Sequence, residues 1–357
     1  MRKTLEFEET LFPDLTARFV STRYQGSKSK LVEQIWEEIS AIHFSTCLDA
    51  FGGTGSVAYM LKKANKPVAY NDALRFNYYF GLALIENSHV RLTSEDLDWV
   101  LDKHSHIQYP RFVQETFTGI YFTDEENAWI DQAITNIRHF TNPYKFALAF
   151  FALCQACIIK RPFNLFHRRN LYIRLSEVER TFGNKASWDR PFHEWFRFFA
   201  SEANQAVFEN GRENRSLNFN AVDAPGSYDL VYIDTPYISR RGVSVDYLQF
   251  YHFLEGLSIY DEWDNYIDRE SKHLRFKPQA NEWTDSKLIY GAFNRLFKRY
   301  QESVLVVSYR SDGIPSESEL VSLLKRYKSS VRLVHLGPYK YVLSTNGESK
   351  EILLIGE

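Results

Sequence analysis

Residues 47–56 read Cys-Leu-Asp-Ala-Phe-Gly-Gly-Thr-Gly-Ser and have the pattern of a short strand, a glycine turn and the start of a helix. The next stretch, residues 57–63, carries apolar side chains at helical spacing. The glycines permit a tight turn and let a ligand approach the backbone closely. The stretch therefore predicts the first half of a βαβ unit with a ligand at its turn. A βαβ unit with a tight turn and no ligand is the alternative.

A second strand and an acidic residue lie downstream of this turn. Residues 67–70 have the pattern of a short strand, and Asn71 and Asp72 follow it. An acidic residue about twenty positions after a glycine turn is placed to bind the hydroxyls of a ribose. The glycine spacing differs from the Gly-x-Gly-x-x-Gly of dinucleotide-binding proteins, which makes an NAD site the weaker interpretation. Asp49, before the glycines, better suits the amino group of a charged amino-acid cofactor.

Another candidate site follows the strand-like run of residues 228–233. Asp234, Thr235, Pro236 and Tyr237 come directly after this run and place an acid, a turn and an aromatic ring where a buried strand ends. Open α/β sheets bind ligands at this edge. The arrangement suits a flat base that carries an exocyclic amine. The Asp234 carboxylate and a backbone carbonyl can accept the two hydrogens of the amine, and the Tyr237 ring can stack on the base. An ordinary β-turn after a core strand is the alternative.

A basic segment near the start of the chain completes the pattern. It contains Tyr24 and Lys28 and precedes residues 31–39, which predict an amphipathic helix. With these pieces in this order, the chain resembles the α-class DNA adenine methyltransferases, the group that includes the Dam enzymes. That family has an aromatic-x-Gly-x-Lys segment, then Asp-x-Phe-x-Gly-x-Gly and Asn-Asp, and after a long variable insert Asp-Pro-Pro-Tyr. The resemblance covers both ends of the chain, whereas the middle matches only loosely.

The resemblance assigns roles to the residues that match these motifs. It implies S-adenosylmethionine as the cofactor, with the binding residues Tyr24, Lys28, Asp49, Phe51, Gly53, Gly55 and Asp72. Tyr24 and Lys28 would help to hold the methionine end, and Asp72 the ribose. The implied catalytic tetrad is Asp234, Thr235, Pro236 and Tyr237. Thr235 stands where the family usually has a proline, but the expected contact there is a backbone carbonyl, which threonine retains. No metal is implied.

The composition limits the classes of protein that remain. The chain has 357 residues, of which 44% are hydrophobic and 25% charged, as is typical of a soluble globular protein. A formal net charge of −2 argues against a non-specific DNA coat, although it is compatible with one basic cleft on an acidic body. Residues 1–6 lack a signal-peptide pattern, and no apolar run reaches the roughly 18 residues of a membrane span. We therefore expect a cytoplasmic protein without a membrane partner.

The chain contains 3 cysteines. Cys154 and Cys157 have the Cys-x-x-Cys spacing, but they lie in an apolar run and no second pair completes a zinc site. We therefore expect both to be buried on a helix.

The pattern along the chain predicts an α/β fold: the Rossmann-like sheet of an S-adenosylmethionine-dependent methyltransferase, with a terminal antiparallel hairpin and a mainly helical insert. Residues 1–73 and 216–357 are expected to form the catalytic domain, and residues 74–215 the helical insert that recognises the target. Predicted helices cover residues 127–134, 143–159, 247–255 and 317–328. The predicted late strands cover residues 304–309, 331–336 and 351–355, the last two flanking residues 339–343. Residues 239–301 are long for a connection, as lids, binding loops and disordered segments are.

Basic and aromatic residues are interleaved in residues 160–170, within a chain of net negative charge. Arginine and lysine can contact phosphates, and arginine or asparagine can read base edges. A solvated basic loop is the alternative. The residues expected to contact DNA are Lys160, Arg161, Asn164, Arg168, Arg169, Arg240 and Arg241.

Together these features predict a site-specific methyltransferase that acts on the 6-amino group of adenine in double-stranded DNA. The target base would be flipped out, because it cannot be reached within the stack. A restriction–modification or related system is the expected setting, with a cognate restriction endonuclease as a possible partner. Three alternatives stay open. They are methylation of RNA or of the exocyclic amine of cytosine, a DNA-binding module without catalysis, and an NAD oxidoreductase. The cytosine alternative is disfavoured, because those enzymes typically carry serine where this chain has Asp234.

Overall fold

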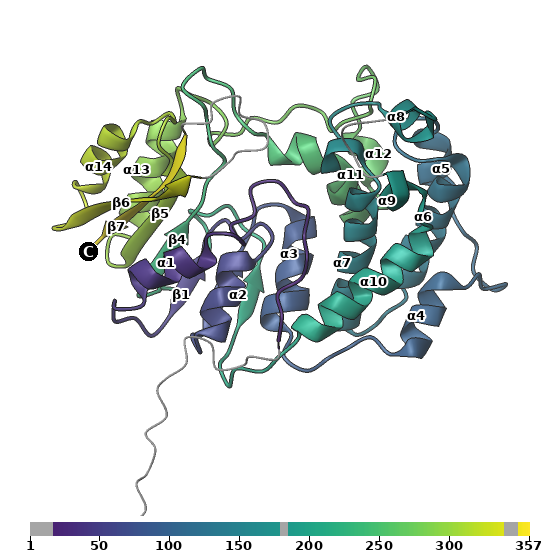
Figure 1. Ribbon diagram of the computed structural model, residues 1–357, viewed down its shortest axis with the longest axis horizontal. Helices are drawn as coiled ribbons and strands as arrows, with labels where there is room; N and C mark the ends of the chain where they lie inside the picture. Colours follow the sequence, from purple (N-terminus) through teal and green to yellow (C-terminus); the bar gives the residue numbers. More distant parts are fainter. Residues whose placement is uncertain (1–16, 179–184, 339–348) are drawn as a thin grey trace, which may run out of the picture.

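Residues 17–178, 185–338 and 349–357 are described by the computed structural model, and they contain one sheet of seven strands (Figure 1). The strands are β1 (Cys47–Asp49), β2 (Val68–Asn71), β3 (Arg215–Leu217), β4 (Leu230–Ile233), β5 (Val304–Arg310), β6 (Val331–Pro338) and β7 (Lys350–Gly356). Their order is β3-β2-β1-β4-β5-β7-β6. Neighbours from β3 to β5 run parallel, whereas β7 runs antiparallel to β5 and β6. The predicted fold class is confirmed, including its antiparallel terminal strands.

The direction of chain growth across the sheet reverses between β1 and β4. From β1 the chain adds β2 and β3 on one side, and from β4 it adds β5 on the other. Asp49, the last residue of β1, pairs with Tyr232 of β4, so the turns after both strands leave the sheet at the same edge. Open α/β sheets bind ligands at such a point.

Successive side chains of the strands alternate between two hydrophobic cores. Cys47 and Tyr232 belong to one core, and Leu48 and Val231 to the other. The first core contains residues of α1 (Val32–Ile39), α2 (Ser56–Lys63), α3 (Arg75–Gly81) and the π-helical turn η1 (Leu82–Glu86). The second contains residues of α13 (Ile289–Arg299) and α14 (Glu317–Leu324). The sheet is therefore a middle layer, with its carboxyl edge left for a site.

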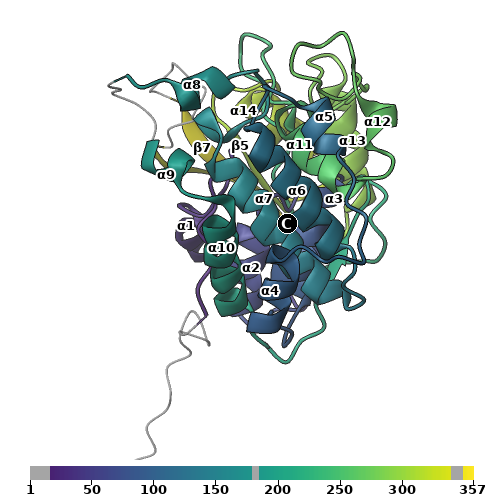
Figure 2. The same cartoon turned by 90° about the vertical axis from the view of Figure 1, so that its right-hand side faces the viewer.

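The other helices lie on the side of the molecule away from β6 and β7, on the right in Figure 1. They are α4 (Ser94–Leu101), α5 (Phe112–Thr116), α6 (Asp124–Ile137), α7 (Pro143–Ile159), the 3₁₀ turn η2 (Pro162–Asn164), α8 (Leu171–Leu175), α9 (Lys185–Asp189), α10 (Phe192–Ala206), α11 (Tyr247–Ser258) and α12 (Trp263–Tyr266). Figure 2 shows α7 between α6 and α10, and it packs against both. Of the helices in the described ranges, none is long and apolar enough to cross a membrane.

Helix α7 shows how the local sequence determines where a helix begins. Asn142 caps its start by accepting hydrogen bonds from the amides of Tyr144 and Lys145, and Pro143, which has no amide hydrogen, takes the first position. Every residue from 147 to 159 is buried. Cys154 and Cys157 are therefore buried on this helix, as predicted, and burial raises the pKa of both thiols.

Most predicted elements are present, and α7 covers the predicted residues 143–159. Helix α13 lies in the long segment 239–301, where the sequence predicted only one helix. Strands β6 and β7 pair as predicted, whereas residues 339–343 of the predicted hairpin lie outside the described residues. The division into a catalytic domain and an insert stays a prediction. At the start of the proposed insert, α3 packs against β2 and β3.

Candidate active site

A cavity of about 380 Å³ lies at the carboxyl edge of the sheet, where the turns after β1 and β4 meet. It brings together most of the residues that the sequence singled out at the two ends of the chain. The predicted residues among those that line it are Tyr24, Lys28, Asp49, Phe51, Gly53, Asp72, Asp234 and Pro236. Three motifs far apart in the sequence therefore share one cavity.

The glycine turn requires glycine for two different reasons. Gly53 and Gly55 have φ angles of +52° and +79°, a region that side chains disfavour. Gly52 instead lies against the ring of Tyr70, where an added Cβ would be 2.0 Å from a ring carbon. The Tyr70 hydroxyl donates a hydrogen bond of 2.7 Å to the Gly53 carbonyl. The turn is thus held against β2 and presents its backbone to the cavity.

Asp49 is a buried carboxylate that is only partly satisfied. Its side chain is 2% exposed, and Oδ2 accepts a hydrogen bond of 3.2 Å from the amide of Ala58 in α2. Among the described residues, Oδ1 has no hydrogen-bond partner. Burial and the charge of Asp234 raise the pKa of Asp49 to about 8. A buried carboxylate is costly unless a cation or donor pairs with it, so this position fits the amino group of a cationic ligand.

Asp72 connects the glycine turn to the start of α3. Its Oδ2 accepts a hydrogen bond from the Gly53 amide (2.9 Å), and its Oδ1 accepts one from the Leu74 amide (2.8 Å). Burial raises the pKa of Asp72. Each carboxylate oxygen has a second acceptor position, which leaves Asp72 able to bind a ligand hydroxyl while it holds the turn.

Lys28 lies against the Asp234 motif, a contact that the sequence did not predict. Its ammonium donates to both carboxylate oxygens of Asp234, at 2.7 and 2.6 Å, and to the Tyr237 hydroxyl at 2.7 Å. Burial raises the pKa of Asp234, although the positive charge of Lys28 opposes this effect. The ammonium therefore occupies the carboxylate that the sequence assigned to a target amine.

Glu351 of β7 is a further member of this group that the sequence did not identify. It is fully buried, its Oε1 accepts hydrogen bonds from Ser308 and Tyr237, and it lies 3.4 Å from the Lys28 ammonium. The available signal was an acidic residue at the start of an otherwise apolar strand. That pattern alone also fits an ordinary strand end.

The remaining tetrad residues form the turn after β4. Thr235 is 3% exposed, and its hydroxyl donates to the Pro236 carbonyl at 3.3 Å. The ring of Tyr237 packs edge-on against Tyr309, with 5.0 Å between ring centroids. Stacking of Tyr237 on a base stays a prediction.

Aromatic side chains from the long segment 239–301 complete the walls of the cavity. Tyr24 stacks on Tyr247 and Tyr251, with centroids 5.6 and 4.4 Å away. Phe51 meets Trp283 edge to face at 5.0 Å. Tyr247 and Trp283 both line the cavity, so part of this segment lies at the candidate site.

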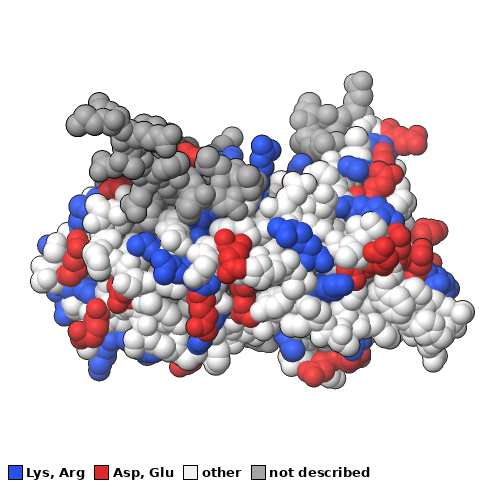
Figure 3. Space-filling view, turned by 90° about the horizontal axis from the view of Figure 1, so that it is seen from below, with Lys and Arg blue, Asp and Glu red and all other residues white. Residues whose placement is uncertain are grey.

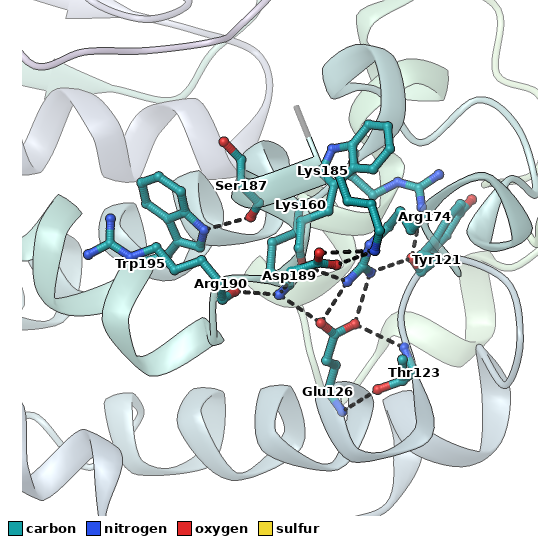
Figure 4. A network of polar contacts seen from close by, with 12 residues as sticks. Tyr121, Thr123, Glu126, Lys160, Arg174, Lys185, Ser187, Asp189, Arg190 and Trp195 are labelled. Carbon is teal, nitrogen blue, oxygen red and sulfur yellow. Dashed lines mark hydrogen bonds and ion pairs between the residues drawn. The ribbon is translucent and has the colours of Figure 1, made fainter. Parts of the chain in front are cut away.

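The expectation that Lys160 and Arg161 contact DNA is wrong, because both side chains are buried. Figure 4 shows Lys160 among its polar partners. The Lys160 ammonium donates to the carbonyls of Trp188 and Arg190 and forms an ion pair of 2.8 Å with Glu126. Arg161, 1% exposed, donates to three carbonyl oxygens, those of residues 121, 165 and 168. Through these contacts, the two side chains join residues near 121–126, 165–168 and 188–190 to the end of α7.

Glu126 joins this network to the start of α6. It forms a capping box with Thr123, and its carboxylate also binds Arg174 at 2.7 and 2.9 Å. Burial alone would raise the pKa of Glu126, but Arg174 and Lys160 outweigh it and hold the pKa below its usual range. Glu126 thus fixes two points that flank the predicted DNA-contact segment.

The other predicted DNA-contact residues are accessible. Arg168, Arg169, Arg240 and Arg241 are exposed, and Asn164 is half-buried. Asn164 and its neighbour Phe163 have φ angles of +58° and +65°, which cost energy in residues other than glycine and are often found at functional sites. The Phe166 amide donates to the Phe250 carbonyl of α11, which ties this segment to a helix that begins at the cavity.

Figure 3 shows a face on which basic and acidic side chains are interspersed. The accessible arginines of residues 160–170 precede α8, which lies at the upper edge in Figure 1, away from the face that Figure 3 presents.

Comparison with known proteins adds independent findings. The family model of D12 class N6 adenine-specific DNA methyltransferases matches residues 24–311. The chain is 28% identical to the type II methyltransferase M2.HphI of Haemophilus parahaemolyticus over 343 residues, which cover 94% of this chain and 95% of that relative. It is 26% identical to the type II methyltransferase M.FokI of Planomicrobium okeanokoites and 24% identical to the modification methylase LlaI of Lactococcus lactis subsp. lactis. Each of these two alignments covers 92% of this chain but only about half of the relative, 51% of M.FokI and 52% of LlaI.

Proposed function

Since the chain belongs to the family of D12 class N6 adenine-specific DNA methyltransferases, we propose that its methyl donor is S-adenosylmethionine and that the acceptor amine is held at Asp234. Membership of this family makes the protein a DNA adenine methyltransferase and argues against the cytosine and oxidoreductase alternatives. We further propose roles for single residues in binding the cofactor and the amine, and a cognate restriction endonuclease as a partner. The last of these is suggested by relatives that are named type II methyltransferases and modification methylases.

One observation carries the choice of cofactor. Asp49 is buried, and one of its oxygens has no hydrogen-bond partner among the residues that the structure describes. The glycine turn beside it opens its backbone to the same cavity. An amino group on the ligand would pair with Asp49, and a ribose hydroxyl would reach Asp72. S-adenosylmethionine has both groups, and the residues present therefore fit it.

The proposed mechanism depends on positioning. When bound, S-adenosylmethionine would supply a methyl group on a sulfonium, and its sulfur would leave as a neutral thioether when the S–CH3 bond breaks. Asp234 and the Thr235 carbonyl accept the two hydrogens of the target amine and thereby aim its lone pair into the cavity. The nitrogen gains positive charge as its new bond forms, and the Asp234 carboxylate would stabilise that charge and accept the proton that the nitrogen then loses. Orientation of this kind can supply a large part of a rate enhancement.

The direct test is to incubate the purified protein with tritiated S-adenosylmethionine and unmethylated genomic DNA, and then to map the modified bases by sequencing. We expect N6-methyladenine at one recurring sequence. Label on cytosine, or DNA that stays unlabelled with correctly folded protein, would contradict the proposal.

Replacing Asp72 by alanine should weaken the binding of S-adenosylmethionine by roughly 1–3 kcal/mol, because a ligand hydroxyl loses its partner. The Gly53 amide also loses its acceptor, so part of the loss reflects a looser turn. Isothermal titration calorimetry measures the affinity. Asp98→Ala, an exposed acid on α4, is the control. An unchanged affinity in folded Asp72→Ala would remove Asp72 from the cofactor site.

Arg168→Gln and Arg169→Gln should each lower the salt dependence of DNA binding by about one unit of slope, the effect of losing one phosphate contact. Binding to an unmethylated duplex is measured as a function of KCl concentration. Lys160→Met is the matched control, because its charge is buried against Glu126. It should lower thermal stability and leave the slope unchanged. If both arginine variants keep the slope of the unmodified protein, the segment is a solvated surface.

A further inference from the structure

Two carboxylates share the Lys28 ammonium at the carboxyl edge of the sheet. Asp234 binds it at 2.6 and 2.7 Å, whereas Glu351 lies 3.4 Å from it. The Tyr237 hydroxyl stands between the two acids, 2.7 Å from Asp234 Oδ1 and 2.5 Å from Glu351 Oε1. One hydroxyl proton can serve only one of these acceptors at a time, so two hydrogen-bond arrangements are available.

The arrangement seen in the structure conflicts with transfer to an amine at Asp234. Lys28 donates to both oxygens of that carboxylate and lines the same cavity. An ammonium beside a nitrogen that is gaining positive charge would raise the barrier, because like charges repel most strongly in a buried site. Lys28 must therefore give up its hydrogen bonds to Asp234 before transfer, and a buried ammonium needs another acceptor.

We propose that Glu351 is the positioning residue that takes over Lys28 when the target amine binds to Asp234. The inference rests on the proposed function of Asp234. A shift of less than about 1 Å would bring the ammonium within normal bonding distance of Glu351 Oε1. Tyr237 then donates to Glu351 and stops competing for Asp234. Ser308 of β5 holds Glu351 in place, and both residues are fully buried, so the acceptor is fixed while the lysine moves.

Glu351→Gln tests this role. Glutamine keeps the size and an oxygen that accepts from Ser308 and Tyr237, but it has no charge to hold the ammonium. We expect kcat for transfer to unmethylated genomic DNA to fall about ten- to a hundredfold, the range for losing a charged hydrogen-bond partner. Binding of S-adenosylmethionine should stay within about threefold, a difference below 1 kcal/mol. An unchanged kcat would overturn the proposal.

A double-mutant cycle with Lys28→Met separates this role from a structural one. In Lys28→Met there is no ammonium for Glu351 to take over. Adding Glu351→Gln to that variant should therefore change kcat by less than about threefold. An equal loss in both backgrounds would show that Glu351 acts independently of Lys28 and would overturn the proposal. Undetectable transfer by folded Lys28→Met that still binds S-adenosylmethionine would also overturn it, because the ammonium would then be required at Asp234.

Two further controls keep the test decisive. If Glu351→Gln does not fold, Ser308→Ala takes its place in the cycle, because it frees the carboxylate from its anchor without removing a charge. Its loss in kcat should be smaller and should again vanish with Lys28→Met. If the unmodified protein places no methyl group on adenine, the proposed function fails first. If it does so and the cycle shows no coupling, only the role of Glu351 fails.

Discussion

Replacing Asp234 with alanine should lower the rate of methyl transfer at least about a hundredfold while the cofactor still binds. Asp234 is the side chain at the end of β4 that can accept a hydrogen bond from the target amine and so aim its lone pair. Its removal misplaces the nucleophile and also strips Lys28 of its nearest partner. The proposed cofactor contacts are made by Asp49, Asp72 and the glycine turn, which belong to other strand ends.

The measurement is transfer of tritiated methyl groups to unmethylated genomic DNA, with calorimetry of cofactor binding in parallel. Thr235→Pro is the matched control within the same turn. It should keep activity, because the expected contact is a backbone carbonyl and proline favours the same turn. Transfer near the normal rate by Asp234→Ala would mean that the active site lies elsewhere. Loss of cofactor binding in that variant would mean that the two sites are not separate.

Replacing Asp49 with asparagine should weaken S-adenosylmethionine binding by roughly 1.5–3 kcal/mol, the value of a hydrogen bond to a charged group. The same change should stabilise the protein without its ligand near pH 8. The pKa of Asp49 is raised by burial to about 8, so the folded state holds this proton more tightly than the unfolded state does. Its contribution to stability is present below the ordinary aspartate pKa and is lost as pH rises through about 8.

The pH dependence gives this prediction a second readout. Cofactor affinity should rise between about pH 7 and 9, as Asp49 loses its proton and can pair with the ligand amine. Asp49→Asn should remove that rise, and it should flatten the fall in thermal stability between about pH 4 and 8. Asp72 and Asp234 titrate in the same cavity, so the difference between the two proteins is the quantity to compare. Equal pH profiles would show that Asp49 does not meet the cofactor.

The sequence predicted those parts of the site that depend on local pattern. The strand, turn and helix around Gly53 follow from residue spacing alone, and the acid after β4 follows from its place at the end of an apolar run. Lys28 and Asp234 were both named, but their contact joins residues 206 positions apart and could not be read from spacing.

The wrong predictions and the missed residues also involve contacts between distant parts of the chain. Lys160 and Arg161 look like a basic surface in the sequence, yet residues near 121–126 and 188–190 bury them and satisfy their charges. Glu351 enters the site only because β7 pairs with β5, which places it opposite Arg310 and close to Ser308. Trp283 belongs to an irregular stretch without periodicity, so no pattern indicated that it would meet Phe51.

The position of β7 between β5 and β6 also determines when the sheet can form during protein synthesis. The ribosome makes residues 350–356 after every other described strand, yet they fill an inner position of the sheet. Until they emerge, β5 and β6 each present an unpaired edge, the kind of edge on which chains aggregate. The nascent protein also lacks Glu351 throughout that interval. The described sheet can therefore be completed only after β7 has been made, and a chaperone that shields the β5 edge until then should raise the yield of folded protein.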